Sequence, residues 1–385
     1  MKNFVVNFEV ANKIIRASVI CDTDSSFSTI LNESYFYQNI EDIEKFIKFI
    51  KTLLTQKIKF KKYSVEYNLI LDDKHFKTQC YINKYEQKVD NKISQTHING
   101  FEQYLSKELD NNSFCLRKKA FMYELINQGV SKKYQTLNFE KQAQILIIHY
   151  SMLFLDSNKE LYLAIISLFK KYNITIKNTF SKSTCLNASQ KLDKHVALVQ
   201  FDAEGVKIDG FFNDVNLFSV NRNLPLDTVI RLVSQKLNCS EEQTHTFLDA
   251  TLTNWSYFNS KKFNSKQGNI LKAFENLIQR LCEFVKKAYY EHYSEGQQVI
   301  FIIKSPYNDL VKSYINDIKY IKIVDFSEND KSYDALDAIH YGAYNLSSLV
   351  NKEDQSQTLT NVNEFKSKNI FQKLFSNFKN NNLRK

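Results

Sequence analysis

Two pairs of short apolar segments constrain the fold of this chain more than any other feature. The first pair, VVNFEV and IIRASVI, is separated by a turn at Ala11 and Asn12. The second pair, Val196–Phe201 and Val206–Phe212, is separated by a turn at 202–205, near the middle of the sequence. Apolar runs joined by a tight turn are typical of β-hairpins. Because each hairpin opens one half of the chain, we predict a duplicated α/β unit that faces its copy across a cleft.

Size, composition and charge narrow the class of protein. A chain of 385 residues favours two or more lobes, and a hydrophobic fraction of 43% is enough to fill their cores. With only 7 glycines and 2 prolines, a glycine-rich phosphate-binding loop is not expected. The formal net charge of +10 suits an acidic partner such as anionic lipid or nucleic acid.

The cysteines and the apolar runs indicate a reduced, soluble body. Six cysteines are scattered without a C-x-x-C pair: Cys21, Cys80, Cys115, Cys185, Cys239 and Cys282. They are expected to be reduced core residues, with no role in a metal site or a disulfide. The longest apolar run, Ile145–Leu155, is too short to span a bilayer. The first residues belong to a strand and show no secretory signal pattern.

Periodicity predicts the elements of the first half of the chain. Asn39 caps a helix with an apolar stripe of helical period, and Asp156 caps a later helix that ends near Asn173. The predicted strands are 28–32, 65–71, 76–82, 120–126, 142–151 and 174–177, with a short helix at 100–109. The stretch from 76 to 155 interrupts the first lobe and is interpreted as an insertion.

The second half is predicted to be richer in helices. Pro225 opens one helix, and Ser240 with Gln243 forms the capping box of the next. Further helices are predicted at 269–293, 308–314 and 335–349 and strands at 299–303 and 320–324, with a polar segment at 254–268. Trp255 is either a partner anchor or local packing, and His340 is interpreted as a structural histidine.

The end of the chain differs in kind from the rest. Residues 351–367 are polar and aperiodic, which indicates a flexible linker, and 368–385 have the composition of a helix lying in the plane of a membrane. One helical face would carry Ile370, Phe371, Leu374, Phe375 and Phe378, with Lys373 and Lys379 beside it. No acidic residue follows Glu364. The alternative is a tail that packs on its own body or stays disordered.

In order and spacing, these segments resemble bacterial FtsA, the actin-like cell-division protein. The best local matches are VEYNLILDDKHF, VALVQFDAEGVKIDGFF with the following segment, YDALDAIHYG and the basic amphipathic tail. The resemblance covers the whole chain and implies an α/β, actin-like (ribonuclease H-like) two-lobed fold with an inserted small α+β domain. It implies a first lobe at 1–76 and 155–194, the small domain at 77–154, and a second lobe at 195–350 with a partner-binding subdomain at 224–292.

The resemblance also implies partners and a location. FtsA proteins polymerise, bind the C-terminal peptide of FtsZ through their second lobe and attach it to the membrane by the terminal helix. The chain is therefore expected to tether FtsZ to an anionic membrane surface at the division site, on the cytoplasmic face, and to self-associate into a protofilament or oligomer.

The nucleotide-cleft positions depart from the family pattern. The resemblance places these positions on Glu9, Ala11, Asn12, Gln200, Asp202, Gly205, Lys304 and Ser305. Glycines are missing at almost all of them, and a backbone N–H approaches phosphate only where side chains are absent and φ is free. We therefore expect a pseudo-ATPase with no catalytic residue, no metal ligand and no cofactor; weak binding of ATP with Mg²⁺ stays open.

Two other functions are alternatives. The first is an active ATP-dependent enzyme, an ATPase or kinase of the same superfold, because a fold does not fix a function. The degraded phosphate loops disfavour it. The second is nucleic-acid binding on charge alone, which is disfavoured because the aromatic residues follow core patterns and do not alternate with lysines on one face.

Overall fold

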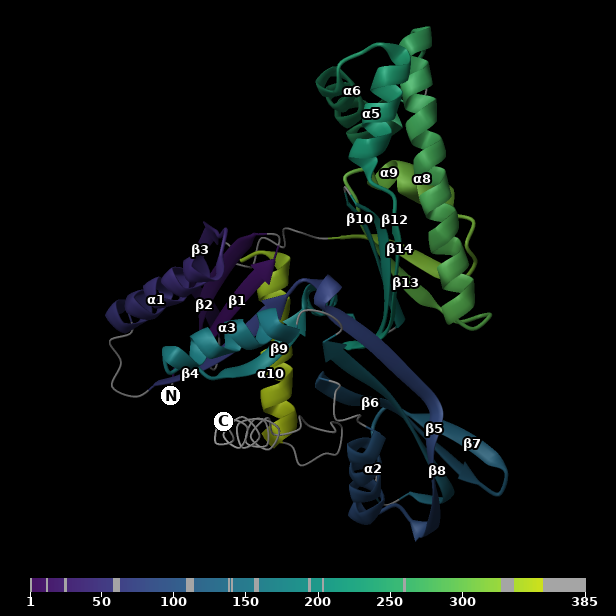
Figure 1. Cartoon of the computed structure of the whole chain (residues 1–385). Helices are drawn as coiled ribbons and strands as arrows, with labels where there is room; N and C mark the ends of the chain where they lie inside the picture. The colour runs from purple at the N-terminus through teal and green to yellow at the C-terminus, as the bar shows by residue number, and fades with distance from the viewer. Residues whose placement is uncertain are drawn as a thin grey trace, which may run out of the picture. The chain divides into compact units, whose positions relative to one another are not determined.

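The structure is a computed structural model that describes residues 2–11, 13–23, 26–57, 63–108, 114–137, 139, 141–155, 159–192, 195–202, 204–258, 261–326 and 336–355. The chain divides into two compact units (Figure 1). Unit 1 comprises Met1–Lys182, Asp334–Leu336 and Ala343–Lys385, and unit 2 comprises Ser183–Tyr333 and Asp337–Gly342.

Unit 1 contains a five-stranded sheet of order β3-β2-β1-β4-β9, here called sheet A. Its strands are β1 (Lys2–Ala11), β2 (Ile14–Thr23), β3 (Ser26–Phe36), β4 (Tyr63–Leu71) and β9 (Ile176–Ser181). The first three strands are antiparallel, whereas β4 is parallel to β1 and β9 is parallel to β4. The predicted N-terminal hairpin and the strand after it are therefore confirmed.

Alternating side chains of β1 face opposite sides of sheet A. Val6 and Phe8 join the core made with α1 (Ile40–Lys57) and α3 (Lys159–Lys171), whereas the buried Asn7 belongs to the other face. Asn39 accepts the Asp42 N–H through its Oδ1 at 3.1 Å, as the predicted cap requires. Asn173 has φ of 56°, the left-handed conformation suited to the end of α3.

Unit 2 repeats this arrangement. Its sheet, here called sheet C, has the order β12-β11-β10-β13-β14. The strands are β10 (His195–Asp202), β11 (Gly205–Phe212), β12 (Val215–Asn223), β13 (Val299–Lys304) and β14 (Ile321–Asp325). Again three antiparallel strands are followed by two parallel ones. The repeated order confirms the predicted duplication and the α/β, actin-like fold class.

Helices complete unit 2. They are α4 (Lys182–Ser189), α5 (Leu226–Leu237), α6 (Glu241–Thr253), α7 (Trp255–Phe258), α8 (Ser265–His292) and α9 (Asn308–Ile315). In Figure 1 the long α8 extends from the strands of sheet C to the helices α5 and α6, and its apolar side shares one core with both. The cap of α6 is as predicted, because the Gln243 N–H donates to Ser240 Oγ at 3.1 Å. The last helix, α10 (Ala338–Gln355), begins among the residues of unit 2 and continues into unit 1.

A separate four-stranded antiparallel sheet, sheet B, lies in the chain between β4 and α3. Its order is β5-β8-β6-β7, with β5 (Phe76–Lys92), β6 (Phe114–Asn127), β7 (Val130–Tyr134) and β8 (Gln142–Leu155). The short 3₁₀-helix η1 (Asp73–His75) precedes it, and α2 (Gln95–Glu108) follows β5. Together with α2 the sheet has its own apolar core. The residue boundaries predicted for the lobes and the small domain stay predictions.

Several predicted elements differ in extent. Strands β7 and β12 and the helix α4 were not predicted; β7 is exposed along most of its length and lacks an apolar face. The segment 254–268, predicted as a polar stretch before a long helix, contains α7 and the first turn of α8. Helix α8 begins at Ser265 because Asn264 Oδ1 accepts the Gln267 N–H. Helix α10 continues through 351–355 of the predicted linker, where neither Gly nor Pro interrupts it. The rest of that linker lies outside the described residues.

Candidate functional site

The two hairpins place one polar residue at the same position before each turn. The last paired residues are Ala11 with Ile14 in the first hairpin and Asp202 with Gly205 in the second. Two residues before those pairs, Glu9 lies opposite Arg16. In the second hairpin the same register position pairs Gln200 with Lys207. Each of the two predicted cleft positions therefore has a cation opposite it on the next strand.

In unit 1 the carboxylate of Glu9 is neutralised from within the unit. The residue is 4% exposed. Its Oε2 lies 3.8 Å from the Arg16 guanidinium, and its Oε1 lies 3.6 Å from the Lys182 ammonium. Ala11 is buried beside it on β1, and Asn12, the remaining predicted position of this hairpin, lies outside the described residues. A carboxylate held by two cations is an ordinary structural charge cluster.

In unit 2 the turn of the second hairpin supplies its own anion. Oδ1 of Asp202 accepts hydrogen bonds from the backbone N–H groups of Glu204 at 2.8 Å and Gly205 at 3.1 Å. Successive N–H groups of a turn are the groups that would bind a phosphate oxygen. Gly205 has φ of +140°, and a Cβ there would lie 2.2 Å from the Arg222 carbonyl oxygen. Glycine is thus required at 205 by the close approach of β12.

A buried charge pair lies behind Gln200 in the same hairpin. Asp209 is fully buried, and its Oδ2 lies 2.9 Å from Lys207 Nζ. The same ammonium donates to Ser183 Oγ at 2.9 Å, and Gln200 Nε2 donates to Asp209 Oδ2 at 3.5 Å. The ammonium of Lys207 therefore supplies the positive charge beside this buried carboxylate.

The Lys304–Ser305 segment is also engaged locally. Lys304 ends β13 in register with Gln200, and its ammonium lies 4.9 Å from the centre of the Phe326 ring. Ser305 Oγ accepts the Tyr307 N–H at 2.9 Å, at the start of α9. Pro306 has no N–H to offer. These groups organise the turn between β13 and α9.

The predicted site residues therefore fall into two sets. Glu9 and Ala11 belong to unit 1, whereas Gln200, Asp202, Gly205, Lys304 and Ser305 belong to unit 2. The neighbouring polar groups that we did not predict are the charged Arg16, Lys182, Lys207 and Asp209 and the hydroxyl of Ser183. A usable signal was present: Arg16 interrupts IIRASV, and Lys207 and Asp209 alternate with apolar residues in GVKIDGFF. Charges on the buried face of a strand need partners.

The membrane-binding residues predicted from the sequence, 370–379, lie outside the described residues. Among the helices that the structure does describe, none is long and apolar enough to cross a bilayer.

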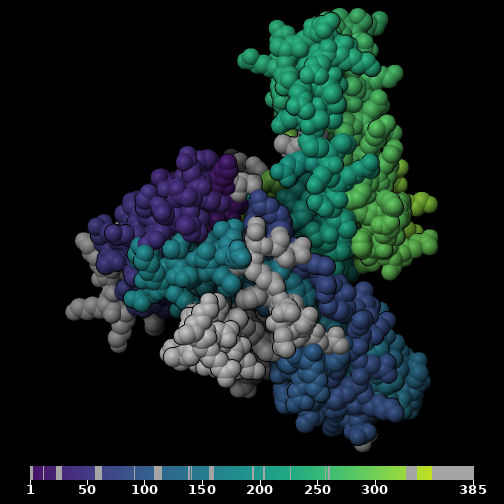
Figure 2. Space-filling view, viewed as in Figure 1, coloured from purple at the N-terminus to yellow at the C-terminus, as the bar shows by residue number. Residues whose placement is uncertain are grey.

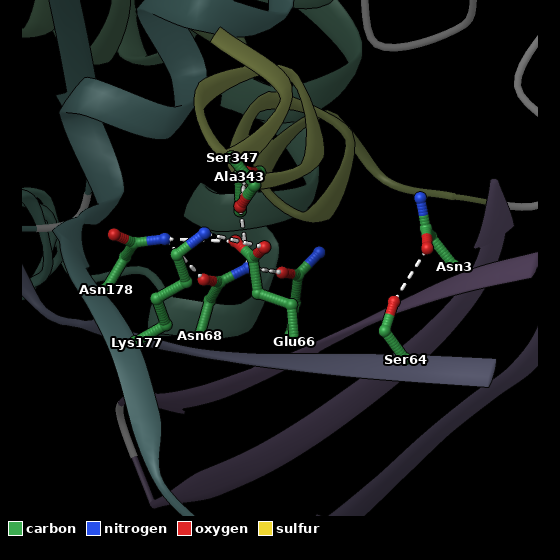
Figure 3. Close-up of polar contacts among 9 residues, drawn as sticks. Asn3, Ser64, Glu66, Asn68, Lys177, Asn178, Ala343 and Ser347 are labelled. Carbon is green, nitrogen blue, oxygen red and sulfur yellow. Dashed lines mark hydrogen bonds and ion pairs between the residues drawn. The ribbon is translucent and has the colours of Figure 1, made fainter. Parts of the chain in front are cut away.

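A second polar cluster, buried in unit 1, was not predicted. Asn7, Asn68 and Asn178 stand at the same level on the neighbouring strands β1, β4 and β9. Asn68 Nδ2 donates to Asn7 Oδ1 at 2.9 Å and to Ser347 Oγ of α10 at 2.7 Å, and Asn178 Nδ2 donates to Asn68 Oδ1 at 2.9 Å (Figure 3). At its outer end Glu66 binds Asn178 and Lys177.

This cluster fixes the position of α10 on sheet A. Its charged members form an ion pair, and its amides bind one another and a hydroxyl that also donates to the Ala343 carbonyl at 3.0 Å. Buried amides with satisfied hydrogen bonds specify one arrangement because any slip of the helix would leave them unpaired. The cluster therefore positions α10 on the sheet.

The helical end of unit 2 carries aromatic side chains. Phe263 contacts both Phe247 and Phe258, with ring centres 5.6 Å and 6.3 Å apart. Next to them, Tyr257 is 61% exposed, and the Lys261 ammonium lies 4.6 Å above its ring. Trp255, for which the sequence left a partner anchor and local packing open, packs against the core of the unit. The exposed aromatic side chain of this region is Tyr257.

Comparisons with known proteins add resemblances of shape at very low identity. No protein family and no curated protein matches the sequence. The chain is similar to a protein of the PilM-PilN type IV pilus biogenesis complex, with 8% identity, a TM-score of 0.44, and coverage of 90% of this chain and 98% of the other. It is similar to a Bacteroides thetaiotaomicron protein with an actin-like ATPase fold and unknown function, with 7% identity, a TM-score of 0.38, and coverage of 90% and 95%.

A third solved structure is the ethanolamine utilization protein EutJ from Carboxydothermus hydrogenoformans. It is 7% identical, with a TM-score of 0.37, and the match covers 83% of this chain and 84% of the other. Because these TM-scores are below 0.5, we assign the fold from the repeated strand order of sheets A and C.

Proposed function

We propose that this protein is a non-enzymatic adaptor of the actin-like fold, a divergent member of the FtsA type. It tethers filaments of FtsZ to the cytoplasmic face of the membrane at the division site and self-associates through actin-like contacts. The proposal combines the resemblance of the whole sequence with the chemistry of the two hairpins.

The non-enzymatic part of the proposal depends on one observation, the hydrogen bonds that Asp202 accepts within its own turn. Its carboxylate already accepts the N–H groups of Glu204 and Gly205, so a phosphate would have to displace a negative charge that belongs to the turn. Phosphoryl transfer depends on positioned backbone donors, cations and a base around the nucleotide. Here the cations opposite the turns, Arg16 and Lys207, are held by the carboxylates of Glu9 and Asp209. These internal pairs support a pseudo-ATPase.

The partner-binding part of the proposal assigns the FtsZ peptide to the helical end of unit 2. An exposed tyrosine with an ammonium over its ring offers an apolar surface and a positive charge together, which suits a peptide carrying apolar and acidic side chains. Tyr257 and Lys261 are such a pair. The membrane part rests on the sequence of 368–385, which combines an apolar face with basic residues.

The test is flotation of the full-length protein with lipid vesicles containing anionic lipid, in the presence of FtsZ from the same organism. We expect FtsZ to float only when the adaptor is present, and to the same extent with or without Mg-ATP. The matched variant is Phe371→Glu with Phe375→Glu, which removes the apolar face and leaves the described fold untouched; it is expected to abolish flotation of both proteins.

Two outcomes would contradict the proposal. If the wild-type protein stays in solution and ignores FtsZ, the resemblance is one of fold alone. If the protein turns over ATP and does not bind FtsZ, the enzyme interpretation replaces the adaptor. FtsZ binding that Tyr257→Ser leaves unchanged would refute the assignment of the peptide to Tyr257.

A further inference from the structure

An exposed apolar patch lies on α1 and the end of β3 in unit 1. We call it the α1 patch and define it by Tyr35, Phe36, Ile40 and Phe49, which are 47%, 57%, 37% and 47% exposed. Figure 2 shows α1, in dark purple, at the surface of its unit. Tyr35 stacks on Phe46 with ring centres 6.3 Å apart, and Phe49 lies 6.3 Å from the same ring. These ring contacts make the patch continuous from Tyr35 of the strand through Phe46 to Phe49 of the helix.

A continuous patch of this kind on a water-facing helix marks an interaction site. The core of unit 1 does not need these side chains, because the buried stripe of α1 is formed by Ile43, Phe46, Ile47, Ile50 and Leu54. Phe49 lies beside that stripe on the solvent side. An occupant with its own apolar face would shield the patch from water.

The charges around the patch distinguish among occupants. Glu41 and Asp42 lie in the first turn of α1, and Glu33 is two residues before Tyr35 on β3, on the same side of the strand. Asp42 already binds Lys45 at 3.2 Å. Lys45, Lys48 and Lys51 lie further along the same helix, towards Phe49. The carboxylates therefore mark the end of the patch at Tyr35 and Ile40, where a basic, apolar segment would find charges of opposite sign.

Such a segment is present in this chain. Residues 368–385 carry five apolar side chains at helical spacing, several lysines and no acidic residue. They are joined to α10, which ends at Gln355, by a stretch that spans about 40 Å at most when extended. Sheet A is five strands wide, which corresponds to about 20 Å, so the extended connection is longer than the sheet is wide.

We propose that the C-terminal segment 368–385 docks on the α1 patch of its own chain when no membrane is present. The same apolar side chains serve both contacts, so docking on the body and insertion into lipid exclude each other. The patch is thus an autoinhibitory binding site. It covers the apolar face of the segment in solution and releases that face at a membrane. This inference rests on the proposed membrane role of the segment.

The first test is photo-cross-linking in the full chain with benzoylphenylalanine in place of Phe49, in dilute solution without vesicles. We expect a cross-link to a peptide within 368–385 of the same chain, and its loss when vesicles with anionic lipid are added. The matched position is Ile82, which is 63% exposed on β5, and it is expected to give no such cross-link. A cross-link to a second copy, or none to the segment, would overturn the proposal.

The second test measures a change in vesicle flotation. Its direction distinguishes docking of the segment on the patch from direct binding of lipid by the patch. The variant Tyr35→Thr with Phe49→Gln keeps residues suited to strand and helix but removes much of the patch. We expect vesicle flotation of this full-length variant to be about threefold that of the wild type or greater, because the α1 patch no longer competes with the membrane for the segment. Ile82→Gln is the control and should float like the wild type. Reduced flotation of the patch variant would show that the patch itself binds lipid, and would refute the docking.

The two tests also separate this inference from the proposed function. If the wild type floats but Phe49 yields no cross-link to the segment, the docking is wrong and the membrane role stands. If the cross-link forms but neither the wild type nor the patch variant floats, the docking stands and the membrane role is wrong.

Discussion

Gly342 of α10 and Cys185 of α4 touch through their backbones. A Cβ on Gly342 would lie 1.7 Å from the carbonyl oxygen of Cys185 and 2.5 Å from its carbonyl carbon. These atoms belong to the main chain and cannot rotate away as a side chain would. The two helices of unit 2 therefore cross at a distance that only glycine permits.

Gly342→Ala is expected to lower the free energy of unfolding by about 3 kcal/mol or more, because the helices must separate to admit a methyl group. Gly268→Ala is the matched control: it also lies in a helix, but a Cβ there would contact nothing within 4 Å. This change should raise stability by about 0.5–1 kcal/mol through helix propensity. Urea unfolding of both variants measures the difference; equal stabilities would refute the close crossing.

Asn68→Ala should be destabilising by about 2–3 kcal/mol, because it leaves the buried amides of Asn7 and Asn178 without their shared partner. The control is Ser64, whose Oγ donates an exposed hydrogen bond to Asn3 Oδ1 at 2.6 Å (Figure 3). Ser64→Ala should change stability by less than about 0.5 kcal/mol. Thermal unfolding distinguishes them, and hydrogen exchange in α10 should rise only in the Asn68 variant.

Lys207→Met is expected to cost about 3 kcal/mol, since it removes a cation from the fully buried Asp209. The double change Lys207→Met with Asp209→Leu should recover much of this loss, because two apolar side chains can replace a buried ion pair. Denaturant titration of the three proteins gives the coupling energy. If the double variant were no more stable than the single one, the pair would not be a structural unit.

Lys118 on β6 should make the stability of the protein depend on pH. Burial lowers the pKa of this lysine from 10.5 to about 8, against an opposing effect of Cys115. Between pH 8 and 10.5 the unfolded chain binds the proton that the folded chain has released, so this group makes the free energy of unfolding rise with pH. Below pH 8 the charged ammonium is buried at a cost.

Lys118→Met should remove that rise. The measurement is the urea midpoint of wild type and variant at pH 7.5 and pH 10, and the quantity of interest is the difference between the two proteins. We expect the variant to have its larger relative advantage at pH 7.5. The same pH dependence in both proteins would show that Lys118 titrates normally.

Much of the fold followed from the sequence, because it depended on local patterns. The hairpin at Val196–Phe212 was readable from apolar runs and a glycine-containing turn, and the caps at Asn39 and Ser240 from residue type alone. The elements that were missed lack such patterns. Strand β7 is held by pairing with β6 and not by an apolar face, and α4 is a buried helix of small and polar residues, which has no amphipathic stripe to detect.

Glu9 and Ala11 lie on the first hairpin and Gln200, Asp202 and Gly205 on the second. Their role in a nucleotide cleft stays a prediction, and their partners were not predicted. Asp202 was identified from alignment with a phosphate loop, whereas its bonds to the N–H groups of its own turn depend on a local conformation. The charges opposite the turns, Arg16 and Lys207, became meaningful only once the strand register was known.

The sequence by itself determined the two α/β units, their order along the chain and the unusual composition of the C-terminal segment. These properties depend on hydrophobic periodicity and turn chemistry, which act over a few residues. The tertiary structure alone decided which distant groups meet: Asn7 with Asn68 and Asn178, Gly342 with Cys185, and Tyr35 with Phe46. The physical reason is that strand register and helix crossing are set by the packing of the whole unit, and a shift of one residue would exchange every one of these partners.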